Sequence, residues 1–152
     1  RTVLADVPVL HAFECEEKSN QLAGTKPRDW CTFSARWHEI LSDPDGKLTG
    51  VTPRVILLDD ILVGSINISP QDGVAALGYW ISSEFWGLGV ATQAVSLMLR
   101  EFNPRPLYAT AAGHNLPSLR VLLKHGFEIR TRQMTPETAR LAARETVTLV
   151  LR

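Results

Sequence analysis

The residues with the clearest chemical potential are two glycines that follow an apolar, aromatic stretch. Residues 76–81 read Ala-Leu-Gly-Tyr-Trp-Ile, and Gly87 and Gly89 come shortly afterwards, directly before a segment with helical periodicity. Glycine lets backbone N–H groups turn toward a ligand because no Cβ blocks the approach. A helix start adds unpaired N–H donors and the positive end of its dipole. This junction is therefore typical of a phosphate- or pyrophosphate-binding loop.

Glycines at such a junction also occur in a simple tight turn, in dinucleotide-binding fingerprints and in P-loops. They could form only a tight turn between a strand and a helix, with no ligand. A dinucleotide-binding fingerprint needs a third glycine where Thr92 stands, in a βαβ unit rather than after a meander. A P-loop needs Gly-Lys-Ser/Thr, which the chain lacks.

Four polar residues farther along could act on a bound ligand. Asn115 and Ser118 lie one turn apart at the start of a predicted helix, where Asn115 can cap the helix, contact a ligand, or do both. His114 precedes them, and histidine is a residue type suited to act as a catalytic base, although a loop histidine without a role fits as well. Tyr108 lies on a predicted strand and can be either a catalytic hydroxyl or a half-buried packing residue.

These residues depend on elements that begin with two helices. Helical spacing of apolar residues covers 7–20, with Asp6 as the cap and Pro8 in the first turn. The same spacing covers 30–41, with Asp29 as the cap. An antiparallel meander is predicted next, with strands at 55–58, 61–68 and 74–81.

The second half alternates strands and helices. It is predicted to contain a helix at 90–102, a strand at 107–111, a helix at 116–123 ended by Gly126, a strand from Phe127, a helix at 137–144 and a strand at 146–151. The order predicts an α/β (α+β) fold with a mixed, mostly antiparallel central sheet, helices beside it, and one parallel crossover around the glycine loop.

Size and charge narrow the function classes. The 152 residues fit one domain with a sizeable core, expected to span 1–152. Lys plus Arg equals Asp plus Glu at 16 each, which argues against a nucleic-acid binder. No apolar run reaches the length of a membrane span. Cys15 and Cys31 do not make a disulfide framework, so a cytoplasmic protein is expected. The chain begins at Arg1 without methionine, which leaves a trimmed N-terminus as an alternative.

With these residues the chain resembles the GCN5-related N-acetyltransferase (GNAT) family, and within it the Rim-like branch that acetylates ribosomal proteins. The resemblance covers about 6–151. It is carried by Gly78-Tyr79-Trp80-Ile81, by Trp86-Gly87-Leu88-Gly89-Val90-Ala91-Thr92, by Asn115 and Ser118, and by Lys124-His125-Gly126-Phe127. The family loop reads Gln/Arg-x-x-Gly-x-Gly/Ala, and Glu84 stands here where Gln or Arg is usual. Backbone N–H groups supply most of such a grip, so this departure is tolerable. Because a carboxylate would repel a pyrophosphate, Glu84 is expected to point away from the ligand.

The resemblance implies acetyl-CoA as cosubstrate, with no metal. Two strands would splay apart so that the pantetheine arm pairs with the first of them near Tyr79, Trp80 and Ile81. Asn115 would hydrogen-bond the arm, and Ser118 would lie near the sulfur. The loop residues implied to wrap the pyrophosphate, together with the helix start, are Phe85, Trp86, Gly87, Leu88, Gly89, Val90, Ala91 and Thr92.

The family reaction needs a neutral amine, a polarised thioester carbonyl and a proton for the departing thiolate. Many members place a tyrosine seven residues after the asparagine, but Leu122 stands there. Ser118, an ordered water or Tyr108 would then donate the proton. His114, Glu84 or waters alone would accept the proton of the amine.

Three functions remain open. The first is N-acetyl transfer to a protein N-terminus or a small-molecule amine, the second a noncatalytic acyl-CoA-binding module, and the third transfer of a longer acyl chain. The acceptor walls are expected to be the first helical pair and 134–144. A homodimer through the terminal strand is plausible.

Other candidate groups have simpler interpretations. The spacing of His11, Cys15, Cys31 and His38 lacks the short pairs of zinc sites. Asp59 and Asp60 are interpreted as a solvated hairpin turn. The arginines at 130, 132, 140 and 144 are interpreted as a solvated surface.

Overall fold

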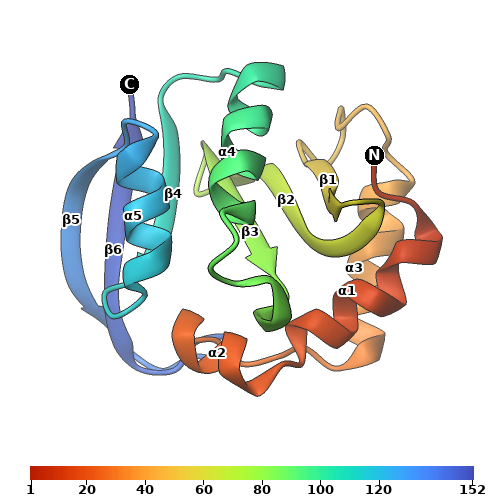
Figure 1. Ribbon diagram of the computed structural model, residues 1–152, viewed down its shortest axis with the longest axis horizontal. Helices are drawn as coiled ribbons and strands as arrows, with labels where there is room; N and C mark the ends of the chain where they lie inside the picture. Colours follow the sequence, from red (N-terminus) through yellow and green to blue (C-terminus); the bar gives the residue numbers. More distant parts are fainter.

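One six-stranded sheet organises the protein, shown in Figure 1 as a computed structural model that describes residues 1–152. The strands lie in the order β1-β2-β3-β4-β6-β5, and every neighbouring pair is antiparallel except β3 and β4. The strands are β1 (Thr52–Leu58), β2 (Ile61–Gln71), β3 (Val74–Ile81), β4 (Leu107–Ala112), β5 (Glu128–Thr135) and β6 (Arg144–Leu151). The predicted fold class is therefore confirmed.

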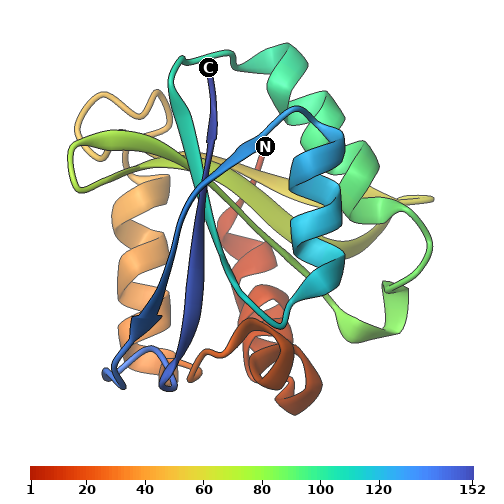
Figure 2. The same cartoon turned by 90° about the vertical axis from the view of Figure 1, so that its left-hand side faces the viewer.

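Helices cover both faces of the sheet. Figure 2 shows α4 and α5 on one side and α3 on the other, and α1 packs on β2, β3 and α3. The helices are α1 (Val7–Glu14), α2 (Glu17–Ala23), α3 (Trp30–Leu41), α4 (Val90–Glu101) and α5 (Leu116–Lys124), with short 3₁₀ turns at Leu4–Asp6 and Ser83–Phe85. None of these helices has the length and apolar character needed to cross a membrane.

The main core lies between the sheet and the helices α4 and α5. Strand alternation explains it: in β4 the apolar residues Leu107, Ala109 and Ala111 are buried, and the residues between them are not. Val95 of α4 and Leu122 of α5 are among the most completely buried side chains of this core. A smaller cluster joins α1 and α3 on the opposite face.

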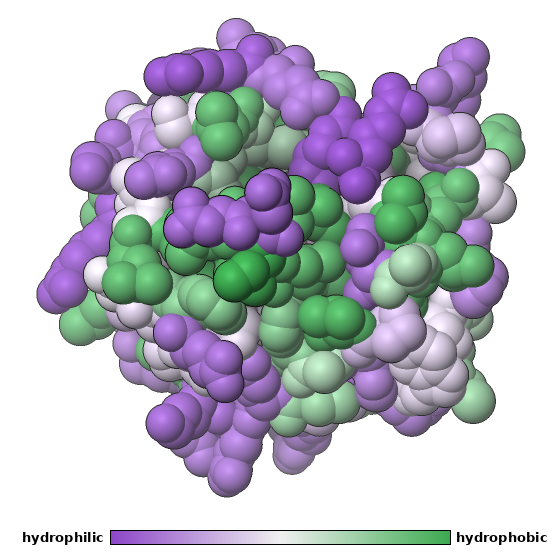
Figure 3. All heavy atoms as spheres, turned by 45° about the vertical axis from the view of Figure 1, so that its right-hand side comes forward, coloured by the Kyte–Doolittle hydropathy of each residue, from purple (hydrophilic) through white to green (hydrophobic).

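Beside β1, at the edge of the sheet, a shallow apolar groove lies against α4. Figure 3 shows hydrophobic side chains gathered on this face, with hydrophilic ones around them. The groove is lined by residues that include Ile56, Leu57, Leu97 and Met98. Val90, the first residue of α4, also lines this groove.

The one parallel strand pair opens almost as soon as it forms. Strands β3 and β4 pair only at Ala75 with Leu107 and at Ala76 with Tyr108. On its other edge β3 stays paired with β2 as far as Ile81. The edge of β3 that faces β4 therefore has no strand partner from Leu77 onward, as the predicted splay requires.

The single helix expected over 7–20 is wrong, because the chain breaks between α1 and α2. Glu16 adopts an extended conformation with ψ 121°. The break is stabilised by Asn20, whose amide donates to the carbonyls of Glu14 and Glu16 at 2.6 and 2.9 Å. The expected cap of α1 is also wrong, since Asp6 makes no side-chain cap bond there and instead accepts from the backbone N–H of Val3.

The helix expected over 137–144 is wrong as well. This segment forms an isolated bridge between Leu141 and Thr25. The backbone N–H of Ala142 donates to the carbonyl of Gly24, and that of Lys26 donates to the carbonyl of Arg140. Helix-forming residue types are overridden here by backbone pairing with a distant segment.

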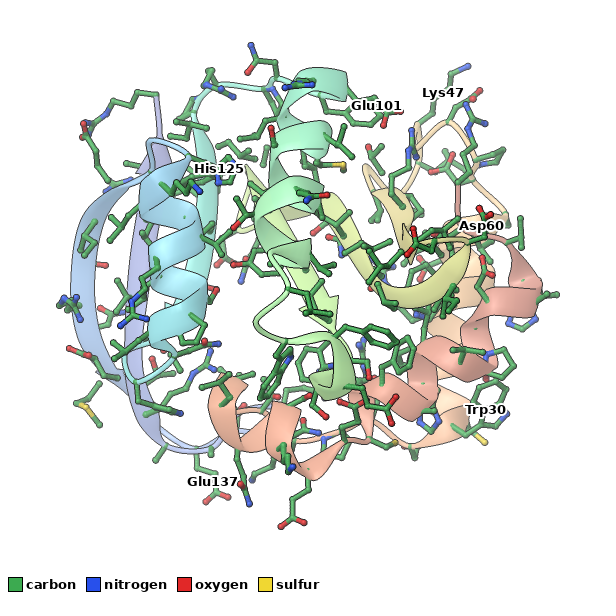
Figure 4. The ribbon with its side chains drawn as sticks, in the orientation of Figure 1. Trp30, Lys47, Asp60, Glu101, His125 and Glu137 are labelled. Atoms are coloured by element: carbon green, nitrogen blue, oxygen red, sulfur yellow. The ribbon has the colours of Figure 1, made fainter.

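The other predicted elements are confirmed. Asp29 caps α3, accepting from the backbone N–H of Thr32 at 2.9 Å. Asp59 and Asp60 form an exposed two-residue turn with φ of 49° and 66°. Figure 4 shows Asp60, with Trp30 and Glu137, at the periphery of the molecule.

Candidate functional site

The loop between β3 and α4 is shaped by its two glycines. Gly87 and Gly89 adopt left-handed φ of +77° and +75°, and nothing lies within 4 Å of where a Cβ would stand on either. The indole of Trp86 donates to the carbonyl of Ile81 at 3.0 Å and so closes the loop back on β3. Gly89 is also the N-cap of α4, whose first-turn N–H groups have no helical partner. The result is an open, donor-rich concavity suited to an anion.

This loop forms one wall of a cavity of about 450 Å³, called the main cavity below. The opened edge of β3 forms a second wall, and α5 and α2 close the remaining sides. Of the residues predicted to hold a cofactor, those that line it are Tyr79, Trp80, Ile81, Phe85, Trp86, Gly87, Gly89, Val90, Ala91, Thr92, Asn115 and Ser118. Leu88 does not line it and is largely exposed.

Inside the main cavity, two hydroxyl groups from different elements meet. Tyr79 Oη of β3 lies 2.8 Å from Ser118 Oγ of α5. Burial raises the pKa of the Tyr79 hydroxyl, and the hydrogen bond with Ser118 opposes that shift in part. Asn115 caps α5 by accepting from the backbone N–H of Ser118 at 3.2 Å, so its amide group is fixed at the cavity wall. Tyr79 therefore stays protonated near neutral pH and can serve Ser118 as a hydrogen-bond partner.

Three other candidates lie outside this cavity. Tyr108 projects from β4 and accepts a hydrogen bond from Arg130 at 2.6 Å. His114 is exposed, and its ring bonds the backbone carbonyl of Gln21 at 3.0 Å. Glu84 is exposed and does not line the cavity, as expected from its charge.

Sequence reasoning missed several residues of the main cavity. Ser19, Leu22 and Ala23 line it from α2. Leu22 and Ala23 lie beyond the predicted end of the first helix, and Ser19 lies inside that helix with no signal to separate it from its neighbours. On α5 the missed residues are Pro117, Arg120 and Val121. Of these, Val121 could have been placed on the same face as Ser118, since it follows Ser118 by three residues.

A carboxylate fastens the helix break to the end of β3. Glu16 accepts from Ser82 Oγ at 2.6 Å, from the backbone N–H of Ser83 at 2.7 Å and from Ser19 Oγ at 2.8 Å. Burial alone would raise the pKa of the Glu16 carboxyl, but these hydrogen bonds outweigh burial and hold the pKa below its usual value. The start of the glycine loop is thereby anchored to the start of α2.

A second cavity, of about 200 Å³, lies beside β3 toward α1 and α3. Tyr79 and Trp80 border both cavities, and Trp80 Nε1 donates to the carbonyl of Phe13 at 2.9 Å. The second cavity is lined by Leu10, Phe13, Glu14, Arg28, Phe33, Trp37, Ser65, Asn67, Gly78, Tyr79, Trp80 and Arg140. The two segments expected as acceptor walls, namely the first helical pair and residues 134–144, both contribute residues to the second cavity.

The interpretation of the four late arginines as a solvated surface is wrong for Arg144, whose Nε is buried without a hydrogen-bond partner, and for Arg140. This side chain reaches into the second cavity, where its Nη2 lies 2.8 Å from Glu14 Oε1. The cause is the irregular, non-helical backbone at 137–143, which is paired with Gly24–Lys26 and brings this side chain beside Glu14 where a surface helix was expected. Arg132, by contrast, makes an exposed ion pair with Glu145.

The candidate zinc ligands do not form a cluster. Cys15 Sγ lies 3.6 Å from His11 Nε2, whereas His38 bonds the backbone carbonyl of Ser34. The protein has no group of three or more His, Cys, Asp and Glu side chains arranged to hold a metal ion.

Comparison with known proteins gives a family and a fold. The sequence matches the family described as acetyltransferase (GNAT) domain over residues 1–128. No curated protein matches the sequence.

Among solved structures, a similar one is Mycobacterium smegmatis RimJ in complex with CoA-disulfide, at 23% identity and a TM-score of 0.73, covering 99% of this chain and 78% of that one. Another is the Salmonella typhimurium acetyl transferase that modifies the N-terminal serine of ribosomal protein L7/L12, at 14% and 0.75, covering 98% and 90%. A third is spermidine N-acetyltransferase from Vibrio cholerae in complex with CoA and spermine, at 13% and 0.78, covering 99% and 91%. The family match spans most of the chain and the overall fold is similar to these solved structures, so the protein belongs to the GNAT family of acetyltransferases.

Proposed function

We propose that the protein transfers an acetyl group from acetyl-CoA to an amine, in the manner of the Rim-like branch. The observation that carries this proposal is the main cavity, where a left-handed glycine loop at a helix N-terminus adjoins an opened parallel strand pair. A long ligand with a pyrophosphate at one end and an extended arm at the other fits both features. The similar structures named above include two that contain CoA, which supports the same ligand here.

The residues present match the parts of such a ligand. Gly87, Gly89 and the first turn of α4 would surround the pyrophosphate, because no Cβ occupies that space. The unpaired edge of β3 from Leu77 onward would pair with the amide groups of the arm, as another strand would. Arg120 at the cavity wall adds a positive charge.

The main cavity and the second cavity share a border, where the two reactants would meet. An amine that enters the second cavity meets Tyr79 and Trp80, which also line the main cavity. The amine nitrogen bonds to the thioester carbon, the carbon–sulfur bond breaks, and its electron pair leaves on sulfur. Ser118 is placed to give this sulfur a proton and to regain one through Tyr79, 2.8 Å away. Water removes the proton of the amine, since neither His114 nor Glu84 lines either cavity and Glu14 is paired with two arginines.

The wider assignment follows from the same site. The proposed acceptor is an amine of a protein N-terminus or of a small molecule, as in the ribosomal-protein and spermidine enzymes. We further propose that residues 1–152 act as one catalytic domain, since strand β3 of the single sheet borders both cavities. Two exposed free thiols, Cys15 and Cys31, favour a cytoplasmic protein.

A matched pair of variants tests acetyl-CoA binding. Gly73 has φ of +80° and open space around it, like Gly87, but lies in the β2–β3 turn. Aspartate tolerates this backbone, so Gly87→Asp and Gly73→Asp should both fold. Unit charges 4 Å apart interact by about 1 kcal/mol in water and about 4 kcal/mol near a protein surface. Only Gly87→Asp should therefore weaken acetyl-CoA binding, by about tenfold or more.

The measurements are the acetyl-CoA-dependent rise of the unfolding midpoint and thiol release over a panel of amines. If acetyl-CoA raises the unfolding midpoint of Gly87→Asp as much as that of the wild type, the proposal that the glycine loop binds the pyrophosphate is contradicted. A midpoint rise without thiol release from any amine would instead favour a noncatalytic acyl-CoA-binding module. That rival is consistent with Leu122, a buried core residue at the position of the usual tyrosine.

A further inference from the structure

The second cavity contains more positive than negative charge. Glu14 is 7% exposed and is its one carboxylate. Arg28 Nε lies 3.0 Å from Glu14 Oε1, and Arg140 Nη2 lies 2.8 Å from the same oxygen. One guanidinium would be enough to neutralise Glu14, so the second leaves the cavity with one uncompensated positive charge.

The two arginines differ in what remains of their hydrogen-bonding capacity. Arg140 is committed, since Nη2 bonds Glu14 and Nη1 donates to the carbonyl of Lys26. Arg28 uses only Nε, and its guanidinium lies over the ring of Phe33 with 5.2 Å from Cζ to the ring centroid. Neither Nη atom of Arg28 has a partner in the protein. Arg28 thus presents the two parallel donors that match a carboxylate.

Neutral polar groups stand across the cavity from these charges. Ser65 and Asn67 alternate with buried Ile66 and Ile68 on β2, so they face away from the main core and line the second cavity. No side-chain hydrogen bond from either residue is formed within the protein. These groups, with Arg28, are donors and acceptors that a ligand can satisfy.

We propose that the acceptor carries a carboxylate close to its reactive amine, and that Arg28 binds this carboxylate while the amine reaches Tyr79 and Trp80. The inference rests on the proposed acetyl transfer and names its substrate class. A cavity of about 200 Å³ is smaller than the 300–1,000 Å³ typical of drug-sized ligands, so it suits an amino acid or the end of a chain. A polyamine would bring further positive charge to a cavity that already has an excess.

The carboxylate has two sources, and the assay separates them. Free α-amino acids are compared with their carboxamides, which keep the amine and lose the charge. Short peptides with aspartate at the second position are compared with peptides that have asparagine there. The ratio of kcat/KM within each pair is measured for the wild type and for Arg28→Met. Intrinsic amine reactivity cancels when the two ratios are divided.

Arg28→Met should lower the preference for the carboxylate by about 10- to 100-fold, since that is the range for hydrogen bonds to charged groups. It leaves Glu14 paired with Arg140 and keeps a side chain over Phe33. Arg36→Met removes a similar charge from the exposed face of α3 and should leave the preference unchanged. The amino-acid pair responding alone identifies a free amino acid, and the peptide pair responding alone identifies an acidic chain end.

Wild-type data keep the inference testable if Arg28→Met does not fold. Carboxylate-bearing acceptors should then exceed neutral ones, and polyamines should be poorest. An equal or higher kcat/KM for polyamines overturns the inference but leaves acetyl transfer intact. If the wild type and Arg28→Met show the same preference for carboxylate-bearing acceptors, the inference is likewise overturned and acetyl transfer remains intact. Absence of thiol release with every amine, despite acetyl-CoA binding, overturns both proposals.

Discussion

Removing the hydroxyl of Tyr79 should slow turnover far more than it destabilises the protein. In Tyr79→Phe the 2.8 Å hydrogen bond to Ser118 Oγ is lost, and the Ser118 hydroxyl can turn to water in the main cavity. A neutral hydrogen bond of this kind contributes about 1 kcal/mol to stability. For a chain of this size, that lowers the unfolding midpoint by about 2–4 °C.

The effect on rate should be larger, because the proposed mechanism places the pair at the departing sulfur. A positioned general acid contributes about 10²- to 10⁴-fold, so Ser118→Ala should lower kcat by about 100-fold or more. Tyr79→Phe should lower kcat by about tenfold or more, since Ser118 remains but loses its orientation. The double variant should be no slower than Ser118→Ala, because residues that act as a unit are not additive.

Single-turnover thiol release and acetyl-CoA titration measure these effects, with Tyr108→Phe as the matched control. That variant removes the same atom from the neighbouring strand, where the hydroxyl bonds Arg130 outside the cavity. A thioester of a more acidic thiol needs less protonation, so it should recover most of the lost rate. An unchanged kcat in Tyr79→Phe, or a double variant whose losses multiply, would refute the proposed proton path.

Three other perturbations have defined outcomes. Asp29→Ala removes the cap of α3 and should cost about 1 kcal/mol, seen as a lower urea midpoint with unchanged acetyl-CoA affinity; no change would mean that water replaces the cap. Glu16 has a lowered folded-state pKa, so its stabilisation is present above its unfolded value near 4.5 and is lost as the pH falls through the folded one. The stability gap between wild type and Glu16→Gln should therefore narrow from pH 6 to pH 3, and a constant gap would contradict this role. His114→Gln should leave the pH profile of kcat unchanged, because that ring bonds a carbonyl of α2; a lost acidic limb would identify His114 as the base.

Periodic elements were the predictable part of the fold. The meander, the crossover and the helix capped by Asp29 follow from alternation, spacing and local capping, which are properties of short stretches of sequence. The two mistaken helices depend on side-chain and backbone partners that spacing alone does not reveal. The break at residue 16 is held by Asn20 nearby and by Ser82–Ser83 far along the chain, and residues 137–143 pair with Gly24–Lys26.

The site was predictable where backbone geometry defines it and not where side chains meet. The glycine loop could be predicted because two glycines between a strand and a helix indicate a backbone conformation that few other residue types adopt. The pairing of Tyr79 with Ser118, and the pairing of Glu14 with Arg140, each join residues on separate elements. The first depends on the position of β3 against α5 and the second on the irregular segment before β6, so both became visible only with the structure.

The early divergence of β3 and β4 bears on the tendency of the protein to aggregate. An unpaired strand edge is usually a liability, because a strand from another chain can add to it and start aggregation. Here the free edge lies in the middle of the sheet, closed at one end by Ala75 and Ala76 and bordered by α4 and α5. A polypeptide strand carries side chains on both faces, so it cannot slide into a slot that is narrow at one end and walled by helices. The proposed pantetheine arm carries no side chains alternating on two faces, so it can enter this slot and pair with the free edge of β3 where a second polypeptide strand would be excluded.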